Sequence, residues 1–171
     1  MAGSDFPMTD FLPQVASRIP NFAGIKFTHE NLMDYGETLQ AAGNRYAILA
    51  GRDEILLSFL VLGAGGAVGS TYNYAAPIFN RLIGAYKEGD LATAQRWQSI
   101  VRRFISMIVK GGGLAANKAL MRLVTGIDCG SVRSPLRTMT PAQLENFREK
   151  LEASGFFAEL TEARRVLVHQ A

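Results

Sequence analysis

The first 73 residues alternate between helical and strand patterns, and no other feature of the sequence limits the fold as strongly. Three segments place apolar residues at helical spacing, and each precedes a short apolar run that is typical of a buried strand. The expected order is helix 8–19, strand 21–27, helix 28–43, strand 45–51, helix 52–66 and strand 67–73. Because short connections join these elements, the alternation indicates crossover helices over a parallel sheet and predicts an α/β fold.

From Ala75 onward the chain is predicted to be helical, apart from one irregular segment. The expected helices cover 75–89, 90–110, 111–126, 140–155 and 156–170, and the irregular segment covers 127–140. All predicted strands therefore fall in the first half, although a parallel strand needs neighbours on both edges. The strand set is incomplete for a barrel or a doubly wound sheet. Since no repeat or linker divides the chain, we expect a single domain over residues 1–171.

Composition and charge are those of an ordinary globular domain. Hydrophobic residues make up 48% and charged residues 19% of the 171 positions. The basic residues are scattered and do not alternate with aromatic ones, so no nucleic-acid partner is expected. No apolar stretch reaches the roughly 20 residues that span a bilayer, and the first residues lack the pattern of a signal peptide. We therefore predict a cytoplasmic location and no membrane partner.

A single cysteine and two histidines leave little scope for metal or thiol chemistry. Cys129 has no partner for an intramolecular disulfide, which favours a reducing compartment, and we interpret it as a structural thiol rather than a nucleophile. With only His29 and His169 in the chain, a zinc site is not expected. The sequence predicts neither a metal nor a cofactor.

The glycine-rich segment 62–70 does not fit a dinucleotide-binding turn. Val68 stands where that motif needs its third small residue after Gly63 and Gly65. These glycines also end a predicted helix before a strand, whereas the motif follows a strand and opens a helix. We interpret the segment as a tight helix-to-strand turn.

Polar and glycine residues follow the three predicted strands at their carboxyl ends. They are Lys26, Thr28, Gly51, Asp53, Glu54 and Ser70. Taken singly they are ambiguous, because Asp53 and Glu54 are equally suited to cap the helix that follows them. Taken together they lie where parallel α/β folds assemble their sites.

Lys26 ends an apolar strand, where we expect its ammonium group to be partly desolvated. A desolvated charge costs roughly several kcal/mol unless it is paired or neutralised. An amine whose pKa is lowered in an apolar site can attack a ketone and form a Schiff base. From these residues alone the alternative remains open that Lys26 simply extends from a strand end into solvent.

Several segments of the chain closely resemble the N-acetylneuraminate lyases, the sialic acid aldolase branch of the pyruvate-dependent class I aldolases. The segments are PNFAGIKFT, GRDEILLSFLVLGAGGAVGSTYN, YKEGDLATAQ and VKGGGLAANKALMRLVTGI. The resemblance extends from about Gly3 to the last quarter of the chain. It implies a (β/α)8 barrel and the reversible cleavage of N-acetylneuraminate to N-acetylmannosamine and pyruvate. It also implies a homo-oligomer, since the family is usually tetrameric.

The resemblance further implies roles for the polar residues at the strand ends. It makes Lys26 the lysine that forms an imine with pyruvate or sialic acid. It places Thr28 beside the reacting end of the sugar acid. The residues that it implies for the hydroxylated tail of the substrate are Gly51, Asp53, Glu54 and Ser70.

The chain departs from the family pattern in two respects. It contains neither the Gly-Thr/Ser-Thr-Gly-Glu segment that holds the substrate carboxylate nor, before the lysine strand, the tyrosine that relays a proton. The chain is therefore expected to match the C-terminal part of the barrel, with strands six to eight and the terminal helices. Since general acid–base catalysis contributes about 10²–10⁴-fold, we expect the isolated chain to be weakly active or inactive.

Two alternatives to this function remain. One is another 2-oxo acid aldolase or an enzyme similar to dihydrodipicolinate synthase, although Asp53 and Glu54 suit a polyhydroxylated substrate better. The other is a non-catalytic truncated product that folds only with a partner half-barrel or with itself.

Overall fold

The computed structural model describes residues 6–167, with side chains as far as Arg165. Gly3 and His169, both named above, lie outside the described residues. The chain divides into two compact units, the first ending at Gly69 and the second beginning at Ser70. The single domain over residues 1–171 stays a prediction, and the two units are described in turn.

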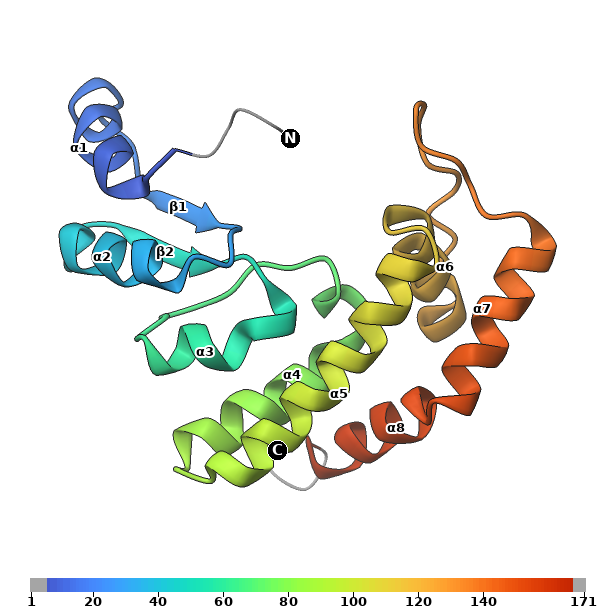
Figure 1. The fold of residues 1–171 in the computed structure, drawn as a ribbon. Helices are drawn as coiled ribbons and strands as arrows, with labels where there is room; N and C mark the ends of the chain where they lie inside the picture. The colour runs from blue at the N-terminus through green and yellow to red at the C-terminus, as the bar shows by residue number, and fades with distance from the viewer. Residues whose placement is uncertain (1–5, 168–171) are drawn as a thin grey trace. The chain divides into compact units, whose positions relative to one another are not determined.

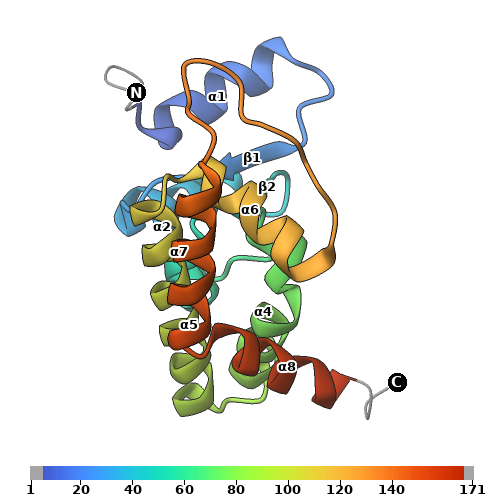
Figure 2. The ribbon, with the colours of Figure 1, turned by 90° about the vertical axis from the view of Figure 1, so that its right-hand side faces the viewer.

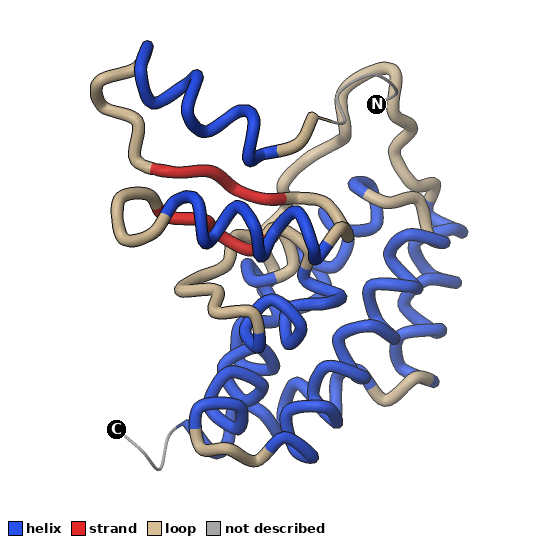
Figure 3. The backbone as a smooth tube through the Cα atoms, turned by 60° about the vertical axis from the view of Figure 1, so that its left-hand side comes forward, coloured by secondary structure: helices blue, strands red, loops and turns tan. Residues whose placement is uncertain are grey.

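The first unit confirms the predicted alternation of helices and strands as far as the third predicted helix. Its elements are α1 (Met8–Arg18), β1 (Gly24–Phe27), α2 (Leu32–Ala42), β2 (Ala47–Ala50), the 3-10 helix η1 (Asp53–Ile55) and α3 (Leu56–Val61). The strands β1 and β2 pair in parallel, with Gly24 opposite Ala47 and Phe27 opposite Ala50. Figure 3 shows the two strands side by side, with the helices α1 and α2 beside them. The α/β class is therefore confirmed, with a sheet of two strands among the described residues.

The third predicted strand, over 67–73, is wrong beyond a single residue. Ala67 forms one isolated parallel bridge with Ala50, whose N–H donates to Gly66 O at 3.0 Å and whose carbonyl accepts from Val68 N at 2.8 Å. The segment then turns into a helix that begins at Tyr72. Glycines offer no side chains to pack on a sheet and lose the most backbone entropy on ordering, so a glycine-rich segment makes a poor strand.

The helix predicted over 52–66 is also shorter than expected. It is divided into η1 and α3, and α3 ends at Val61. Gly63 follows with a φ of 99°, a left-handed conformation that stops the helix and that glycine adopts without strain.

One face of the small sheet packs against aromatic side chains from α2 and α3. Phe27, Ile48 and Ala50 are buried on this face. The ring of Phe27 lies 5.2 Å from that of Tyr35, which in turn lies 4.6 Å from Phe59. The Tyr35 hydroxyl donates a 3.0 Å hydrogen bond to the carbonyl of Ile48, which fixes α2 against β2. This aromatic cluster forms the core of the first unit.

Burial raises the pKa of Tyr35 from its ordinary 10 to about 12, which predicts a loss of stability in alkali. The contribution is complete below pH 10 and declines between pH 10 and 12, because the unfolded phenol ionises there while the buried one does not. Two pKa units correspond to at most roughly 2–3 kcal/mol. We expect Tyr35→Phe to cost about 1 kcal/mol at neutral pH through the lost hydrogen bond, and to unfold with a weaker pH dependence above pH 10. Urea titrations at several pH values check this, and parallel declines of the two proteins would contradict it.

The second unit is helical, as predicted. It consists of α4 (Tyr72–Lys87), α5 (Leu91–Lys110), α6 (Leu114–Thr125), α7 (Pro141–Ala153) and α8 (Phe156–Leu167). The longest helix, α5, lies alongside α4, and α8 packs against α4 (Figures 1 and 2). The buried face of α5 carries Ala94, Trp97, Val101, Phe104 and Ile108 at helical spacing.

Two helix starts in this unit follow directly from the local sequence. The Asp90 side chain accepts a 3.0 Å hydrogen bond from Thr93 N at the start of α5. At the start of α7, Thr140 and Gln143 form a reciprocal capping box, with Pro141 as the first helical residue. Each contact satisfies backbone donors that a helix end would otherwise leave unpaired.

The segment 127–140 contains no helix or strand, which confirms the irregular segment expected there. A lysine fastens it to α6, because Lys118 Nζ donates to the carbonyls of Cys129 at 2.9 Å and Ser131 at 2.7 Å. Cys129 itself is exposed and forms no disulfide.

Candidate functional site

The carboxyl ends of β1 and β2 bring three of the predicted site residues together. Gly51 N donates a 2.8 Å hydrogen bond to Phe27 O, which continues the ladder one residue beyond β2. A Cβ atom placed on Gly51 would lie 2.3 Å from Thr28 Oγ1, 2.8 Å from Phe27 O and 3.1 Å from Lys26 Cε. The side chains of Thr28 and Lys26 therefore lie directly against the backbone of Gly51, which no larger residue would permit without movement.

A second close approach joins η1 to the segment after the isolated bridge. Asp53 is 6% exposed, and its carboxylate lies where the side chain of Gly69 would be. A Cβ atom on Gly69 would fall 1.8 Å from Asp53 Oδ1. The absence of a side chain at position 69 thus makes room for a buried carboxylate.

This contact predicts a large structural effect of Gly69→Ala. The new methyl group requires Asp53 to move, and overpacking of this kind costs about 1–3 kcal/mol. Gly65→Ala is the matched control, since no atom lies within 4 Å of the added methyl group. Urea denaturation of both variants measures the difference, and equal stability of the two would show that Asp53 adapts freely.

Glu54 is held by a neighbouring arginine that also binds a third carboxylate. Arg52 Nη1 lies 2.9 Å from Glu54 Oε1, and Arg52 Nη2 lies 2.5 Å from Glu30 Oε2. The hydrogen bond to Glu54, joined by the attraction of both carboxylates, raises the pKa of Arg52 above its ordinary value despite the effect of burial. A hydrogen bond to its own backbone and the charge of Arg52 lower the pKa of Glu30.

Ser70 is the first residue of the second unit and is exposed. Its carbonyl accepts a 2.9 Å hydrogen bond from Asn73 Nδ2, so the backbone at position 70 is fixed at the start of α4. Ser70 follows Gly69 directly, and its part in the site stays a prediction.

The expectation that Lys26 is partly desolvated is wrong, because Lys26 is exposed in the structure of the first unit. Side chains alternate along a strand, so Lys26 lies on the sheet face opposite Phe27. The aromatic cluster covers the face of Phe27, whereas Leu49, the register partner of Lys26, is only half-buried. The apolar neighbours in the sequence therefore belong to the other face and do not enclose the lysine.

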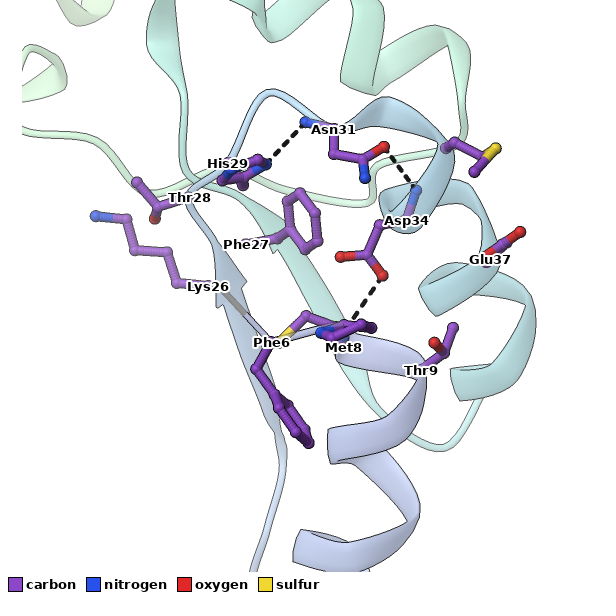
Figure 4. A pocket seen from close by; sticks show the side chains of 12 residues that line it. Phe6, Met8, Thr9, Lys26, Phe27, Thr28, His29, Asn31, Asp34 and Glu37 are labelled. Carbon is purple, nitrogen blue, oxygen red and sulfur yellow. Dashed lines mark hydrogen bonds between the residues drawn. The ribbon is translucent and has the colours of Figure 1, made fainter. Parts of the chain in front are cut away.

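A pocket of about 430 Å³ opens between the end of β1 and the first turns of α1 and α2. Figure 4 shows how it is held, with Asp34 Oδ1 accepting from Met8 N at 3.2 Å and Asn31 Oδ1 accepting from Asp34 N at 3.2 Å. Lys26 and Thr28 contribute to its lining, but the Lys26 side chain extends away from Asp34 and Met8 (Figure 4). Its lining residues are Phe6, Pro7, Met8, Thr9, Lys26, Phe27, Thr28, His29, Asn31, Met33, Asp34 and Glu37, without Gly51, Asp53 or Glu54. This pocket therefore shares Lys26 and Thr28 with the site at the strand ends, but none of the other predicted site residues of the first unit.

Across residues 6–167, no three of the side chains of His, Cys, Asp and Glu gather closely enough to hold a metal ion. None of the helices described has the length and apolar character needed to cross a membrane.

Two residues of the site were not predicted from the sequence. Glu30 and Arg52 were not among the predicted site residues, although Arg52 stands between Gly51 and Asp53 in the chain. Their opposite charges follow two strands expected to be parallel neighbours, and that juxtaposition was the available signal. Gly69 lay within a segment already quoted, but only its contact with Asp53 shows why glycine stands there.

Comparison with known proteins shows that most of the chain is similar in sequence to one protein family. The model of the dihydrodipicolinate synthetase family matches residues 8–154. The N-acetylneuraminate lyase of Rattus norvegicus is 39% identical over 160 residues, which cover 92% of this chain and 50% of the rat protein. The human protein of the same name is 37% identical over the same length.

Solved structures agree with the sequence comparison. The N-acetylneuraminate lyase of Aliivibrio salmonicida superposes with a TM-score of 0.84 at 39% identity and covers 90% of this chain, with 51% of its own chain matched. The enzyme from Proteus mirabilis superposes with a TM-score of 0.83 at 38% identity over 88% of this chain and 51% of its own. The chain thus spans about half the length of the curated relatives that it matches.

Proposed function

Because the chain belongs to the dihydrodipicolinate synthetase family, we propose that it carries the Schiff-base site of an aldolase that cleaves N-acetylneuraminate to N-acetylmannosamine and pyruvate. The contact of Lys26 and Thr28 with Gly51, at the carboxyl ends of two parallel strands, carries this proposal. The names and identities of the relatives, 37–39% for several N-acetylneuraminate lyases, support this substrate over other 2-oxo acids.

In the proposed reaction Lys26 is the nucleophile. Its neutral Nζ adds to the C2 ketone of the open-chain sugar acid, and uptake of one proton from solvent with loss of water leaves a protonated imine. Removal of the proton from the C4 hydroxyl breaks the C3–C4 bond, and the electron pair moves into the imine to give an enamine. The aldehyde of N-acetylmannosamine leaves, C3 of the enamine takes up a proton, and hydrolysis of the imine releases pyruvate and restores the lysine.

The neighbouring residues position the substrate. Thr28 presents its hydroxyl beside the lysine, where the reacting end of the sugar acid lies, and Gly51 leaves the space that both side chains need. The carboxylates of Asp53 and Glu54 accept hydrogen bonds from the hydroxyls of the tail. Ser70 adds a hydroxyl from the segment that follows Gly69.

We further propose that β1 and β2, followed by the single bridging residue Ala67, belong to the C-terminal part of a (β/α)8 barrel. Barrel enzymes of this class build their sites at the carboxyl ends of the strands, where the residues named above stand. The sequence holds no Gly-Thr/Ser-Thr-Gly-Glu segment and no tyrosine on a strand before β1. Turnover by these 171 residues is therefore expected to be slow, by about 10²–10⁴-fold for the missing acid–base group.

The test is a substrate panel followed by proton NMR over many hours, so that slow turnover is still measured. N-acetylneuraminate, 2-keto-3-deoxygluconate, and pyruvate with aspartate semialdehyde are each supplied to the purified protein. We expect pyruvate and N-acetylmannosamine to form from the first substrate and the other two to react more slowly. Preferential reaction of either of the others would contradict the proposed substrate while leaving the Schiff-base chemistry in place.

A further inference from the structure

Arg52 connects the two loops that carry the proposed site. Glu30 belongs to the loop after β1, and Glu54 lies in η1 after β2. The guanidinium of Arg52 contacts both, through Nη2 at 2.5 Å and Nη1 at 2.9 Å respectively. We propose that Arg52 is a positioning residue that, anchored by Glu30, holds one oxygen of Glu54 so that the other binds a hydroxyl of the substrate tail.

The hydrogen bonds of Glu54 fit this role. Its Oε1 is engaged by Arg52, while its Oε2 makes no hydrogen bond to any other residue in the described part of the chain. An ionised carboxylate can accept several hydrogen bonds, so Oε2 remains able to accept one from a sugar hydroxyl. Glu54 is therefore oriented through one oxygen and available through the other.

The geometry requires arginine rather than any cation. The planar guanidinium presents two terminal nitrogens in a fixed fork, and each binds a different carboxylate here. A lysine at position 52 has one compact ammonium group, which can meet Glu54 or Glu30 but does not hold both in a fixed relation. The link between the two loops is thus specific to arginine.

A merely stabilising role is a weaker explanation of this contact. The side chains of Arg52 and Glu30 are 37% and 66% exposed, and exposed ion pairs contribute little to stability. In addition, Arg52 Nε is buried and has no hydrogen-bond partner in the part of the chain that the structure describes. A buried nitrogen without a hydrogen-bond partner lowers the stability of the fold, so this placement of Arg52 is not explained by stability alone.

The second unit supplies a matched control. Arg148 on α7 also bridges two glutamates, Glu145 and Glu152, and its side chain is 38% exposed. The hydrogen bonds and the negative charges of these two glutamates raise the pKa of Arg148, as Glu54 and Glu30 raise the pKa of Arg52. Arg148→Met therefore removes an equivalent ion-pair network at a position that the proposed site does not use.

The inference rests on the proposed function, so its test uses a ligand that does not need Lys26. N-acetylmannosamine carries the hydroxylated tail without the ketone, and its affinity is measured by titration calorimetry or ligand-observed NMR. We expect Arg52→Met to weaken its binding about tenfold, Arg52→Lys to weaken it less, and Arg148→Met to leave it unchanged. The double variant Arg52→Met/Glu54→Gln is expected to bind no more weakly than Glu54→Gln alone, because both changes remove the same interaction.

Each other outcome contradicts a defined part of the account. Equal binding by Arg52→Met and the parent protein, or independent effects of the changes at Arg52 and Glu54, would overturn the positioning role. A parent protein that forms a pyruvate adduct but does not bind N-acetylmannosamine would overturn it as well. A parent that binds N-acetylmannosamine in an Arg52-dependent manner but forms no adduct would instead contradict the aldolase chemistry of Lys26.

Discussion

Lys26→Arg is expected to reduce pyruvate release from N-acetylneuraminate to the uncatalysed background. The guanidinium stays protonated at every accessible pH and cannot form an imine, whereas the positive charge at position 26 is kept. Because Lys26 is exposed at the end of β1, the substitution is expected to change stability by no more than about 0.5 kcal/mol. Long incubations followed by NMR measure the rate, and circular dichroism checks the fold.

Lys110→Arg is the control for this substitution. Lys110 is likewise exposed and lies at the end of α5, and its side chain forms no hydrogen bond or ion pair with the residues that the structure describes. The proposed site does not use it, so its replacement is expected to leave the rate unchanged. Retention of more than a tenth of the parent rate by Lys26→Arg would show that another group performs the chemistry.

Gly51→Ala is expected to lower the rate of imine formation at Lys26 by about 100-fold, since a displacement of about 1 Å has that effect in a preorganised site. The added methyl group would lie 2.3 Å from Thr28 Oγ1 and 2.8 Å from Phe27 O. Thr28 can rotate, but Phe27 O is part of the hydrogen-bonded ladder and cannot move without separating the strand ends. We also expect a loss of about 1–3 kcal/mol of stability from overpacking.

Gly36→Ala provides the comparison for a glycine that makes no such contact. Gly36 lies within α2, and no atom lies within 4 Å of an added methyl group. In a helix interior alanine is favoured over glycine by about 0.5–1 kcal/mol, so this variant is expected to be more stable and equally reactive. If Gly51→Ala trapped pyruvate as fast as Gly36→Ala, the close approach at position 51 would have no part in the chemistry.

The alternation of helices and strands was predictable because each element has its own local signature. The capping residues Asp90 and Thr140 also act within four residues of themselves, so the helices that they start were placed correctly. The strand over 67–73 was predicted wrongly. Its sequence, two apolar residues followed by glycine and polar residues, is compatible both with a strand and with a single bridge before a helix.

The exposure of Lys26 shows a different limit of local reasoning. Its neighbours Ile25 and Phe27 are apolar, yet only the alternation of faces and the position of the aromatic cluster decide what surrounds the lysine. The residue composition of a strand averages over its two faces and does not tell which face is buried. The face that carries the functional residue is fixed by tertiary packing.

The contacts at the strand ends could be anticipated as a set but not as geometry. Parallel strands place their carboxyl ends together, which was sufficient to group Lys26, Thr28 and Gly51. The contact of Asp53 with Gly69 and the bridge from Arg52 to Glu30 depend on distances between loops, and no local pattern encodes those.

The most direct test of the Schiff-base account is reduction with borohydride in the presence of pyruvate, followed by intact-mass measurement and peptide mapping. The account predicts the mass of one trapped pyruvate per chain, located in the peptide that contains Lys26 and absent from Lys26→Arg. Lys118, whose ammonium is engaged by two backbone carbonyls, serves as an internal reference that should remain unmodified. An adduct at another lysine, or no adduct when a full-length N-acetylneuraminate lyase is labelled under the same conditions, would contradict Lys26 as the nucleophile of this chain.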